Sequence, residues 1–313
     1  MARAFVFPGQ GSQSVGMGRD LAEASTTARQ VFEEVDDALS QNLSRLMFEG
    51  PQDELTLTEN AQPALMAVSV AVVRTLEQDG GLVLADKAAF VAGHSLGEYS
   101  ALCAAGALSL PDTARLLKRR GQAMQKAVPV GVGAMAALLG LDYETALSVA
   151  EDAAGEQVCA PANDNAEGQV VVSGHAEAVA RAVELAKERG ARRPMLLPVS
   201  APFHCPLMQP AADEMSQALA DIALAAPAVP LVANVTAEAV EQPDAIRDLL
   251  VRQVTAMVRW RESVLYLRDH DVDHLVEVGA GKILTGLTRR IDRAVGGRAV
   301  NGPDDIETFL KEA

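Results

Sequence analysis

The chain has 313 residues, of which 49% are hydrophobic and 22% charged, and its formal net charge at pH 7 is −15. This length and apolar content are enough to bury the core of one large domain or of two smaller ones. The acidic balance argues against nonspecific binding to nucleic acid, because neutralising phosphates requires a net basic face.

The sequence has neither a long apolar run nor a recognisable leader. No stretch reaches the roughly 18 uncharged apolar residues that a transmembrane helix needs, and the first residues lead directly into a short apolar segment. The three cysteines, Cys103, Cys159 and Cys205, are irregularly spaced, which argues against a disulfide framework or a four-cysteine metal site. We therefore expect a cytoplasmic globular protein that does not interact with a membrane.

The first part of the chain alternates strands with helices, which is typical of an α/β protein. Residues 4–7 predict a strand closed by Pro8 and Gly9. Residues 62–76 predict a helix that is buried on most sides, because small and apolar residues occupy nearly every face. Residues 88–92 predict a strand, and a buried helix ends near residue 108. Between them lies a tight, glycine-bounded turn.

The middle of the chain has a different pattern. The expected elements are strand 134–139, helix 143–153, strand 158–162, turn 163–168, strand 170–173, helix 176–189 and strand 195–199. This βαββαβ order is that of a ferredoxin-like unit, and the segment is long enough to have its own core. Glycines before this segment and prolines after it mark the points where the chain is expected to cross between two bodies. We expect a small ferredoxin-like domain (131–200) inserted in a large hydrolase-like α/β domain (1–130 and 201–313).

The last third is expected to return to the main sheet, with strands at 231–234 and 274–278 and helices at 243–257 and 282–294. Three basic clusters interrupt the acidic sequence. Each is either a solvated helix face or a local binding place for an anionic ligand or partner. The clusters are Lys118 to Arg120, Arg189 with Arg192 and Arg193, and Arg289 with Arg290 and Arg293.

Residues 93–97, Gly-His-Ser-Leu-Gly, fit the G-x-S-x-G nucleophile elbow. In that turn the serine is exposed between a strand and a helix, and the helix N-terminus favours negative charge near the serine oxygen. Ordinary glycine turns share the pattern, but the flanking strand and helix favour a catalytic Ser95.

A serine nucleophile needs a base, and four of the five histidines are poor candidates. His94 is expected to point away from its neighbour Ser95 across the turn. His175 ends a strand of the insert, where a capping or solvent role is expected. His270 and His274 would share a face only on a helix, and a strand is expected there, which disfavours a metal pair.

His204 is the remaining candidate for the base. It lies between Pro202 and Pro206, and a loop made rigid by two prolines is unusual for a simple linker. The alternative is a loop histidine whose hydrogen bonds are satisfied without a catalytic role. Cys205 has no neighbour that would stabilise a thiolate, so we expect a small buried residue rather than a nucleophile.

A glycine-rich loop, residues 8–13, follows the first strand. It fails the dinucleotide-binding pattern because Ser14 replaces the third glycine, and Lys282 followed by Ile283 fails the P-loop pattern. The loop is nevertheless suited to presenting backbone N–H groups. The amides of Gln10 and Leu96 could together form an oxyanion hole.

Taken together, these motifs resemble the bacterial malonyl-CoA:acyl carrier protein transacylase family. The matching segments are residues 7–13 (FPGQGSQ), residues 93–98 (GHSLGE), Arg120-Gly121 followed by Met124, Phe203-His204 and residues 277–279 (EVG). The similarity runs from about residue 5 to about residue 290 in the family's order and spacing. One departure is Ala280, where many relatives have proline, and it affects only the rigidity of that loop.

The resemblance implies a set of catalytic roles. Ser95 corresponds to the acyl-accepting serine and His204 to the general base and acid. Gln10 and Leu96 match the oxyanion-hole positions, and Gln253 matches a residue whose backbone carbonyl orients the histidine. The family thus uses a Ser-His dyad with a carbonyl, and no catalytic Asp is expected.

The resemblance also implies a substrate and a partner. Arg120 matches the arginine that pairs with the free malonyl carboxylate, while its neighbour Arg119 is expected on an exposed helix face. Phe203 matches a bulky residue that crowds the α-carbon of the acyl group. The implied reaction is ping-pong malonyl transfer from malonyl-CoA to acyl carrier protein in fatty acid biosynthesis, by a monomer without metal or other cofactor.

Three alternatives remain at this point. A hydrolase could use the same elbow with water as acceptor, although it would have no use for Arg120. A noncatalytic carrier-binding module could keep the fold, although the serine, histidine and arginine argue against it. A malonyl-transferring subunit of a malonate decarboxylase would share nearly every motif, and polyketide synthesis could replace fatty acid synthesis as the pathway.

Overall fold

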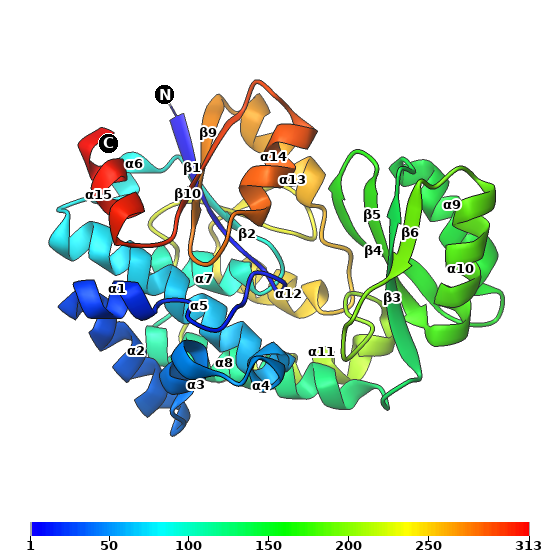
Figure 1. The fold of residues 1–313 in the computed structure, drawn as a ribbon, viewed down its shortest axis with the longest axis horizontal. Coiled ribbons are helices and arrows are strands. Elements are labelled where there is room, and N and C mark those ends of the chain that lie inside the picture. Colours follow the sequence, from blue (N-terminus) through cyan, green and yellow to red (C-terminus); the bar gives the residue numbers. More distant parts are fainter. Residues whose placement is uncertain (1, 313) are drawn as a thin grey trace.

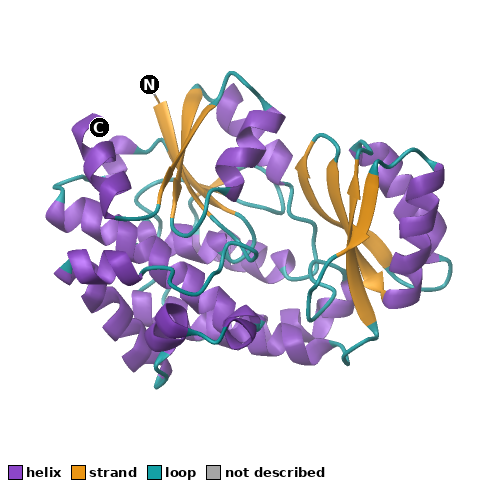
Figure 2. Cartoon of the chain, viewed as in Figure 1, coloured by secondary structure: helices purple, strands orange, loops and turns teal. Residues whose placement is uncertain are grey.

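The computed structural model describes residues 2–312, which form two β-sheets that each carry their own helices (Figures 1 and 2). The larger sheet has the order β10-β9-β1-β2-β7-β8, and all neighbouring strands are parallel except β7 and β8. Its strands are β1 (Ala2–Phe7), β2 (Phe90–Gly93), β7 (Leu231–Val232), β8 (Ala239–Val240), β9 (Val272–Val278) and β10 (Gly296–Val300).

Helices cover both faces of this sheet, because successive side chains of a strand point to opposite faces. In β1, Phe5 and Phe7 join one hydrophobic core while Ala4 and Val6 join another. The first core is built by α1 (Arg19–Ala24), α2 (Thr26–Leu39), α3 (Leu43–Glu49), α4 (Gln52–Thr56), α5 (Thr58–Arg74), η1 (Thr75–Asp79), α6 (Leu84–Lys87), α7 (Gly97–Ala104), α8 (Leu110–Ala127), η2 (Pro206–Met208), α11 (Gln209–Ala220), α12 (Pro243–Gln253) and α15 (Pro303–Glu312). The second is built by α13 (Trp260–Asp269) and α14 (Ile283–Ile291).

The smaller sheet confirms the predicted βαββαβ order. Its elements are β3 (Gly133–Leu139), α9 (Tyr143–Ala154), β4 (Cys159–Ala166), β5 (Gln169–His175), α10 (Ala176–Glu188) and β6 (Arg193–Leu196). The strands are antiparallel in the order β4-β5-β3-β6, which is the ferredoxin-like arrangement. Ala136 and Leu138 of β3 pack with α9 and α10, whereas Met135 and Ala137 join the core of the large body.

The turn predicted at residues 163–168 is wrong, because β4 continues to Ala166 and only Glu167 and Gly168 turn. The end of β4 pairs with a distant segment: Val258 N donates to Ala162 O at 2.9 Å, and Asp164 N donates to Val258 O at 3.0 Å. These bonds join the small sheet to the large body. A local pattern of polar residues could not reveal that partner.

Two further expectations need adjustment. The strand predicted at 195–199 is β6 (Arg193–Leu196), so the chain leaves the sheet at Leu197 and is free to run along a cavity. Several amphipathic helices between Arg19 and Thr56 were not predicted. Within residues 2–312, none of the helices is both long enough and apolar enough to span a bilayer.

Candidate active site

Ser95 lies in the turn between β2 and α7, as the elbow motif predicts. Its φ is +54°, a left-handed conformation that is unusual for a residue other than glycine. A Cβ at Gly93 would lie 1.9 Å from the carbonyl carbon of Gly97, and a Cβ at Gly97 would lie 2.3 Å from the Phe7 oxygen. Both residues must therefore be glycine, because a side chain at 93 would clash within the turn and one at 97 would clash with the end of β1.

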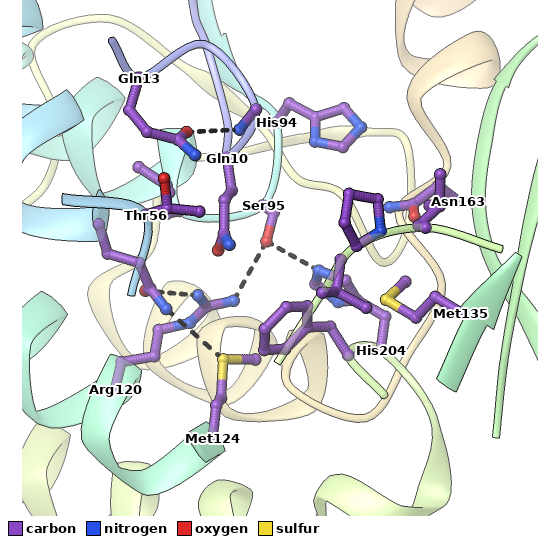
Figure 3. Close-up of a pocket in the computed structure, with 17 residues that line it drawn as sticks. Gln10, Gln13, Thr56, His94, Ser95, Arg120, Met124, Met135, Asn163 and His204 are labelled. Atoms are coloured by element: carbon purple, nitrogen blue, oxygen red, sulfur yellow. Dashed lines mark hydrogen bonds between the residues drawn. The ribbon is translucent and has the colours of Figure 1, made fainter. Parts of the chain in front are cut away.

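Ser95, His204 and Gln253 form a hydrogen-bonded chain. Ser95 Oγ lies 2.7 Å from His204 Nε2, and His204 Nδ1 lies 2.9 Å from the backbone oxygen of Gln253. Figure 3 shows the serine and the imidazole pointing toward each other in the cavity. The structure thus brings together the three residues that the sequence named, and a carbonyl occupies the place that a carboxylate has in a Ser-His-Asp triad.

The His204 imidazole is held in its neutral form. Burial, followed by the nearby Arg120 cation, lowers the pKa of His204 to about 3. The unfolded chain would bind a proton at this residue below its ordinary pKa of 6.5, so this group costs stability as the pH falls from about 6.5 toward 3. Near neutral pH the imidazole is available to accept the Ser95 proton.

The Arg120 side chain is 1% exposed and projects from α8 into the same cavity (Figure 3). One of its terminal nitrogens donates to Gln62 Oε1 at 2.7 Å, and the other donates to Gln253 Oε1 at 2.9 Å and to Ser95 Oγ at 3.3 Å. Burial lowers the pKa of the guanidinium, and no carboxylate forms an ion pair with it in the described chain. Arg120 is therefore a buried cation whose side-chain hydrogen bonds go to neutral groups.

Local packing explains why Arg120, and not Arg119, reaches the cavity. A Cβ on Gly121 would lie 2.4 Å from the Cα of Glu59, so this glycine allows α8 to pack closely against α5. Arg119 points to α11 instead, where its Nε lies 2.5 Å from Glu214 Oε1 with 43% of the side chain exposed.

Gln10 and Leu96 line the same cavity as Ser95. Neither backbone N–H has a hydrogen-bond acceptor among residues 2–312. The Gln10 side chain is held by Thr58, whose Oγ1 donates to Gln10 Oε1 at 2.9 Å. Two unpaired N–H groups near a nucleophile can stabilise an oxyanion.

The cavity has a volume of about 390 Å³ and is lined by residues of both the large body and the small sheet. The small sheet and the segment after it contribute residues that the sequence interpretation did not include. They are Met135, Asn163, Leu197, Pro198 and Val199. Phe203, which precedes the base, also lines the cavity and is 9% exposed.

Asn234 was missed by sequence reasoning although it supports the elbow directly. Its Oδ1 accepts the Ser95 N–H at 2.7 Å, and its Nδ2 donates to the Gly93 oxygen at 2.7 Å. Asn234 follows β7, which pairs with β2 in the sheet. This adjacency exists only in the fold, so no local motif could have indicated the residue.

The other histidines and Cys205 have structural partners. His94 Nε2 lies 2.8 Å from Asn165 Oδ1, and His175 Nδ1 accepts the Val158 N–H at 2.9 Å. His270 stacks on Tyr266. The buried thiol of Cys205 donates to a backbone oxygen, and burial raises its pKa, so it is a poor nucleophile. The described residues contain no group of three or more potential His, Cys, Asp or Glu metal ligands.

Comparisons with known proteins agree with this geometry. A family model for the acyl transferase domain matches residues 4–294. The chain is 48% identical over 308 residues to the malonyl CoA-acyl carrier protein transacylase of Escherichia coli (strain K12), covering 98% of each chain. The acyl-carrier-protein-S-malonyltransferase of Bartonella henselae has a TM-score of 0.98 and 57% identity, with 100% of this chain and 99% of that chain covered.

A further relative was solved as a complex. It is a malonyl-transacylase bound to a type II PKS acyl-carrier protein, with a TM-score of 0.96, 43% identity and 100% of both chains covered. The elbow, the Ser-His pair and the full-length matches lead to one conclusion: this chain belongs to the acyl transferase family, among the malonyl CoA-acyl carrier protein transacylases.

Proposed function

We propose that this chain moves a malonyl group from coenzyme A to the phosphopantetheine thiol of an acyl carrier protein, through a malonyl ester on Ser95, and so supplies fatty acid biosynthesis. The observation that carries the proposal is the position of Ser95 Oγ, 2.7 Å from His204 Nε2 and 3.3 Å from the Arg120 guanidinium in one cavity. A nucleophile, a neutral base and a fixed cation meet there.

In the first half-reaction, His204 Nε2 takes the Ser95 proton as Oγ attacks the thioester carbonyl. The Gln10 and Leu96 amides donate to the oxyanion that forms. When the tetrahedral intermediate collapses, the carbon–sulfur bond breaks, and His204 returns the proton to the sulfur, so coenzyme A leaves as a thiol. The backbone oxygen of Gln253 keeps the imidazole oriented throughout.

In the second half-reaction, His204 takes the proton of the phosphopantetheine thiol, and the sulfur attacks the malonyl ester. The ester bond to Ser95 breaks, and His204 returns the proton to Oγ. This ping-pong sequence balances with malonyl-CoA and the carrier thiol alone, so we propose that no further cofactor takes part. A hydrolase would use water in this step and gain nothing from a buried cation at the acyl end of the cavity.

The decisive experiment is intact mass spectrometry after incubation with malonyl-CoA. We expect the protein to gain one malonyl increment, and the increment to move to holo acyl carrier protein when the carrier is added. Loss of the increment to water alone would identify a hydrolase. If the chain gains no increment under any condition, the proposal is wrong.

The Arg120→Ala variant is expected to lose its preference for malonyl. A guanidinium can hold a carboxylate through two parallel hydrogen bonds, and losing them should lower the malonyl-to-acetyl ratio of kcat/KM by about 10- to 100-fold. Arg120→Lys should recover only part, because it lacks the planar fork. Arg119→Ala, on the exposed face of α8, is the matched control and should keep the ratio. If the malonyl-to-acetyl ratio falls only in Arg119→Ala, then Arg119 and not Arg120 binds the malonyl carboxylate.

The Phe203→Ser variant is expected to accept methylmalonyl-CoA better relative to malonyl-CoA, by roughly severalfold. Phe203 lines the cavity next to the base, so removing its ring opens space at the α-carbon of the acyl group. Competition between the two thioesters measures the ratio, and thermal unfolding measures stability. A variant that is only less stable, with an unchanged ratio, would assign Phe203 to core packing.

The domain boundaries, the oligomeric state and the location in the cell are also proposals. We propose a small domain at 131–200 within a large domain formed by 1–130 and 201–313, and the separate core under α9 and α10 supports this division. We further propose that the protein works as a monomer in the cytoplasm.

A further inference from the structure

Glu98 is a fully buried carboxylate in the first turn of α7, three residues after the nucleophile, and it is 1% exposed. Both of its oxygens accept hydrogen bonds. Oε1 accepts the backbone N–H of Asn234 at 3.0 Å, and Oε2 accepts from Nε2 of Gln253. None of the catalytic steps described above uses this carboxylate.

The two partners of Glu98 hold different parts of the active site. Asn234 braces the elbow through the Ser95 N–H and the Gly93 oxygen. Gln253 holds the base through its backbone oxygen, and its side-chain Oε1 accepts from the guanidinium of Arg120. Gln253 Nε2 also donates to the backbone carbonyl oxygen of Ser95 at 2.9 Å. Glu98 is therefore the junction between the nucleophile and the two groups that serve it.

We propose that Glu98, in its ionised form, is a positioning residue for malonyl transfer, because it keeps Asn234 and Gln253 in the orientations that align Ser95, His204 and Arg120. This inference rests on the proposed function.

The ionised form is required by the donors that face Glu98. A carboxylate accepts on both oxygens, whereas an amide accepts on one side only and a protonated carboxyl carries an O–H donor of its own. The amide would leave the Asn234 N–H or the Gln253 amide facing another donor, and the protonated carboxyl would bring a donor into a place where both partners are donors. The side-chain amide of Gln253 cannot flip to compensate. Flipping would place its oxygen against the backbone oxygen of Ser95 and its NH₂ group against the guanidinium of Arg120.

Glu98 is also the group at this site whose charge changes near neutral pH. Burial raises the pKa of Glu98 to about 7, against the opposing effects of its hydrogen bonds and of Arg120. The pKa of His204 is lowered to about 3, and burial also lowers the pKa of His94. Burial raises the pKa of Tyr99, the next residue in α7, to about 12. Arg120 stays cationic.

Protonating Glu98 should therefore affect rate and stability in opposite directions. The folded pKa of about 7 lies above the ordinary value of 4.5, so the folded state binds more protons than the unfolded state between these values. Lowering the pH through this window therefore raises the contribution of Glu98 to the unfolding free energy. The protonated carboxyl at the same time weakens its hydrogen bond to Asn234 or Gln253, which should slow the reaction. His204 has the opposite effect on stability in the same window, so the unfolding free energy is measured beside the rate to separate a slower reaction from unfolding.

The test is the rate of Ser95 malonylation in a single turnover with malonyl-CoA, quenched and read by intact mass between about pH 5.5 and pH 8.5. We expect the wild-type rate to fall with an apparent pKa near that of Glu98. Glu98→Gln should be about 10- to 100-fold slower at the alkaline end, with no inflection, because one buried hydrogen bond to a charged group is lost. Glu98→Asp should keep the inflection at an intermediate rate. Because wild type gains stability from protonation of Glu98 as the pH falls, the unfolding free energy of Glu98→Gln should fall further than that of wild type between about pH 7 and pH 5.

Glu277 provides the matched control. It lies in β9 and is equally buried, and its oxygens accept the N–H groups of Leu284 at 3.0 Å and Thr285 at 2.7 Å in α14. Glu277→Gln should keep the inflection of the wild-type profile. A flat wild-type profile, or a Glu98→Gln variant with the wild-type rate and inflection, would overturn the inference. The wild-type profile decides the matter even if Glu98→Gln does not fold. A wild-type protein that gains no malonyl increment at any pH would instead refute the proposed function.

Discussion

Replacing Ser95 with alanine is expected to abolish the malonyl adduct completely. The adduct is an ester on Oγ, and among the described residues Ser95 is the only hydroxyl with a hydrogen bond to His204. The measurement is intact mass after incubation with excess malonyl-CoA, together with transfer to carrier protein. Both signals should vanish, not merely decrease.

The conformation of Ser95 calls for a second variant. Its φ is +54°, a conformation that is strained for any residue with a Cβ and that glycine adopts readily. Ser95→Gly removes the hydroxyl without that strain and should be equally inactive. Ser100→Ala is a matched control, since Ser100 is a buried serine of α7 whose hydroxyl has no partner among the described residues. Any malonyl increment on Ser95→Gly would place the nucleophile elsewhere.

Replacing His204 with alanine is expected to slow malonylation by about two to four orders of magnitude, the usual range for loss of a general base. His204 Nε2 lies 2.7 Å from Ser95 Oγ, and its depressed pKa keeps the imidazole neutral and able to accept a proton near neutrality. A hydroxyl without that base is a weak nucleophile. Rapid-quench mass spectrometry in a single turnover measures this step apart from carrier binding.

His204 also has a positive φ, of +59°, so backbone strain must again be separated from chemistry. Asparagine tolerates the left-handed conformation better than alanine and carries no base. We expect His204→Asn and His204→Ala to be slowed to a similar extent. If His204→Asn instead reacts at the wild-type rate, His204 maintains the loop and another group accepts the proton.

Local rules were sufficient where neighbouring residues dictate the geometry. The elbow could be predicted because glycines at 93 and 97 are required by atoms a few residues away or on the adjacent strand. The βαββαβ unit could be predicted because its alternation of apolar residues reflects burial within one segment. The resemblance to known transacylases supplied Arg120, and the close packing that Gly121 allows gives the physical reason.

Contacts between distant segments were not predictable in the same way. The polar residues at 163–168 predict a turn, whereas the backbone at Asn163 and Asp164 pairs with Val258 of the large body. Strand β10 begins with Gly296 and Gly297, which are poor strand formers, and it is held by its parallel pairing with β9. In both cases tertiary hydrogen bonds outweigh a weak local preference.

The sequence by itself determined the elbow motif around Ser95, the place of His204 in its proline-bounded loop and the order of the elements that carry them. Only the tertiary structure decided how these groups act together. Asn234, Glu98 and Gln253 come from separate parts of the chain, yet they hold the nucleophile, base and cation in one network. The pKa values of His204 and Glu98 likewise depend on burial, which is a property of the packed fold and of no single segment.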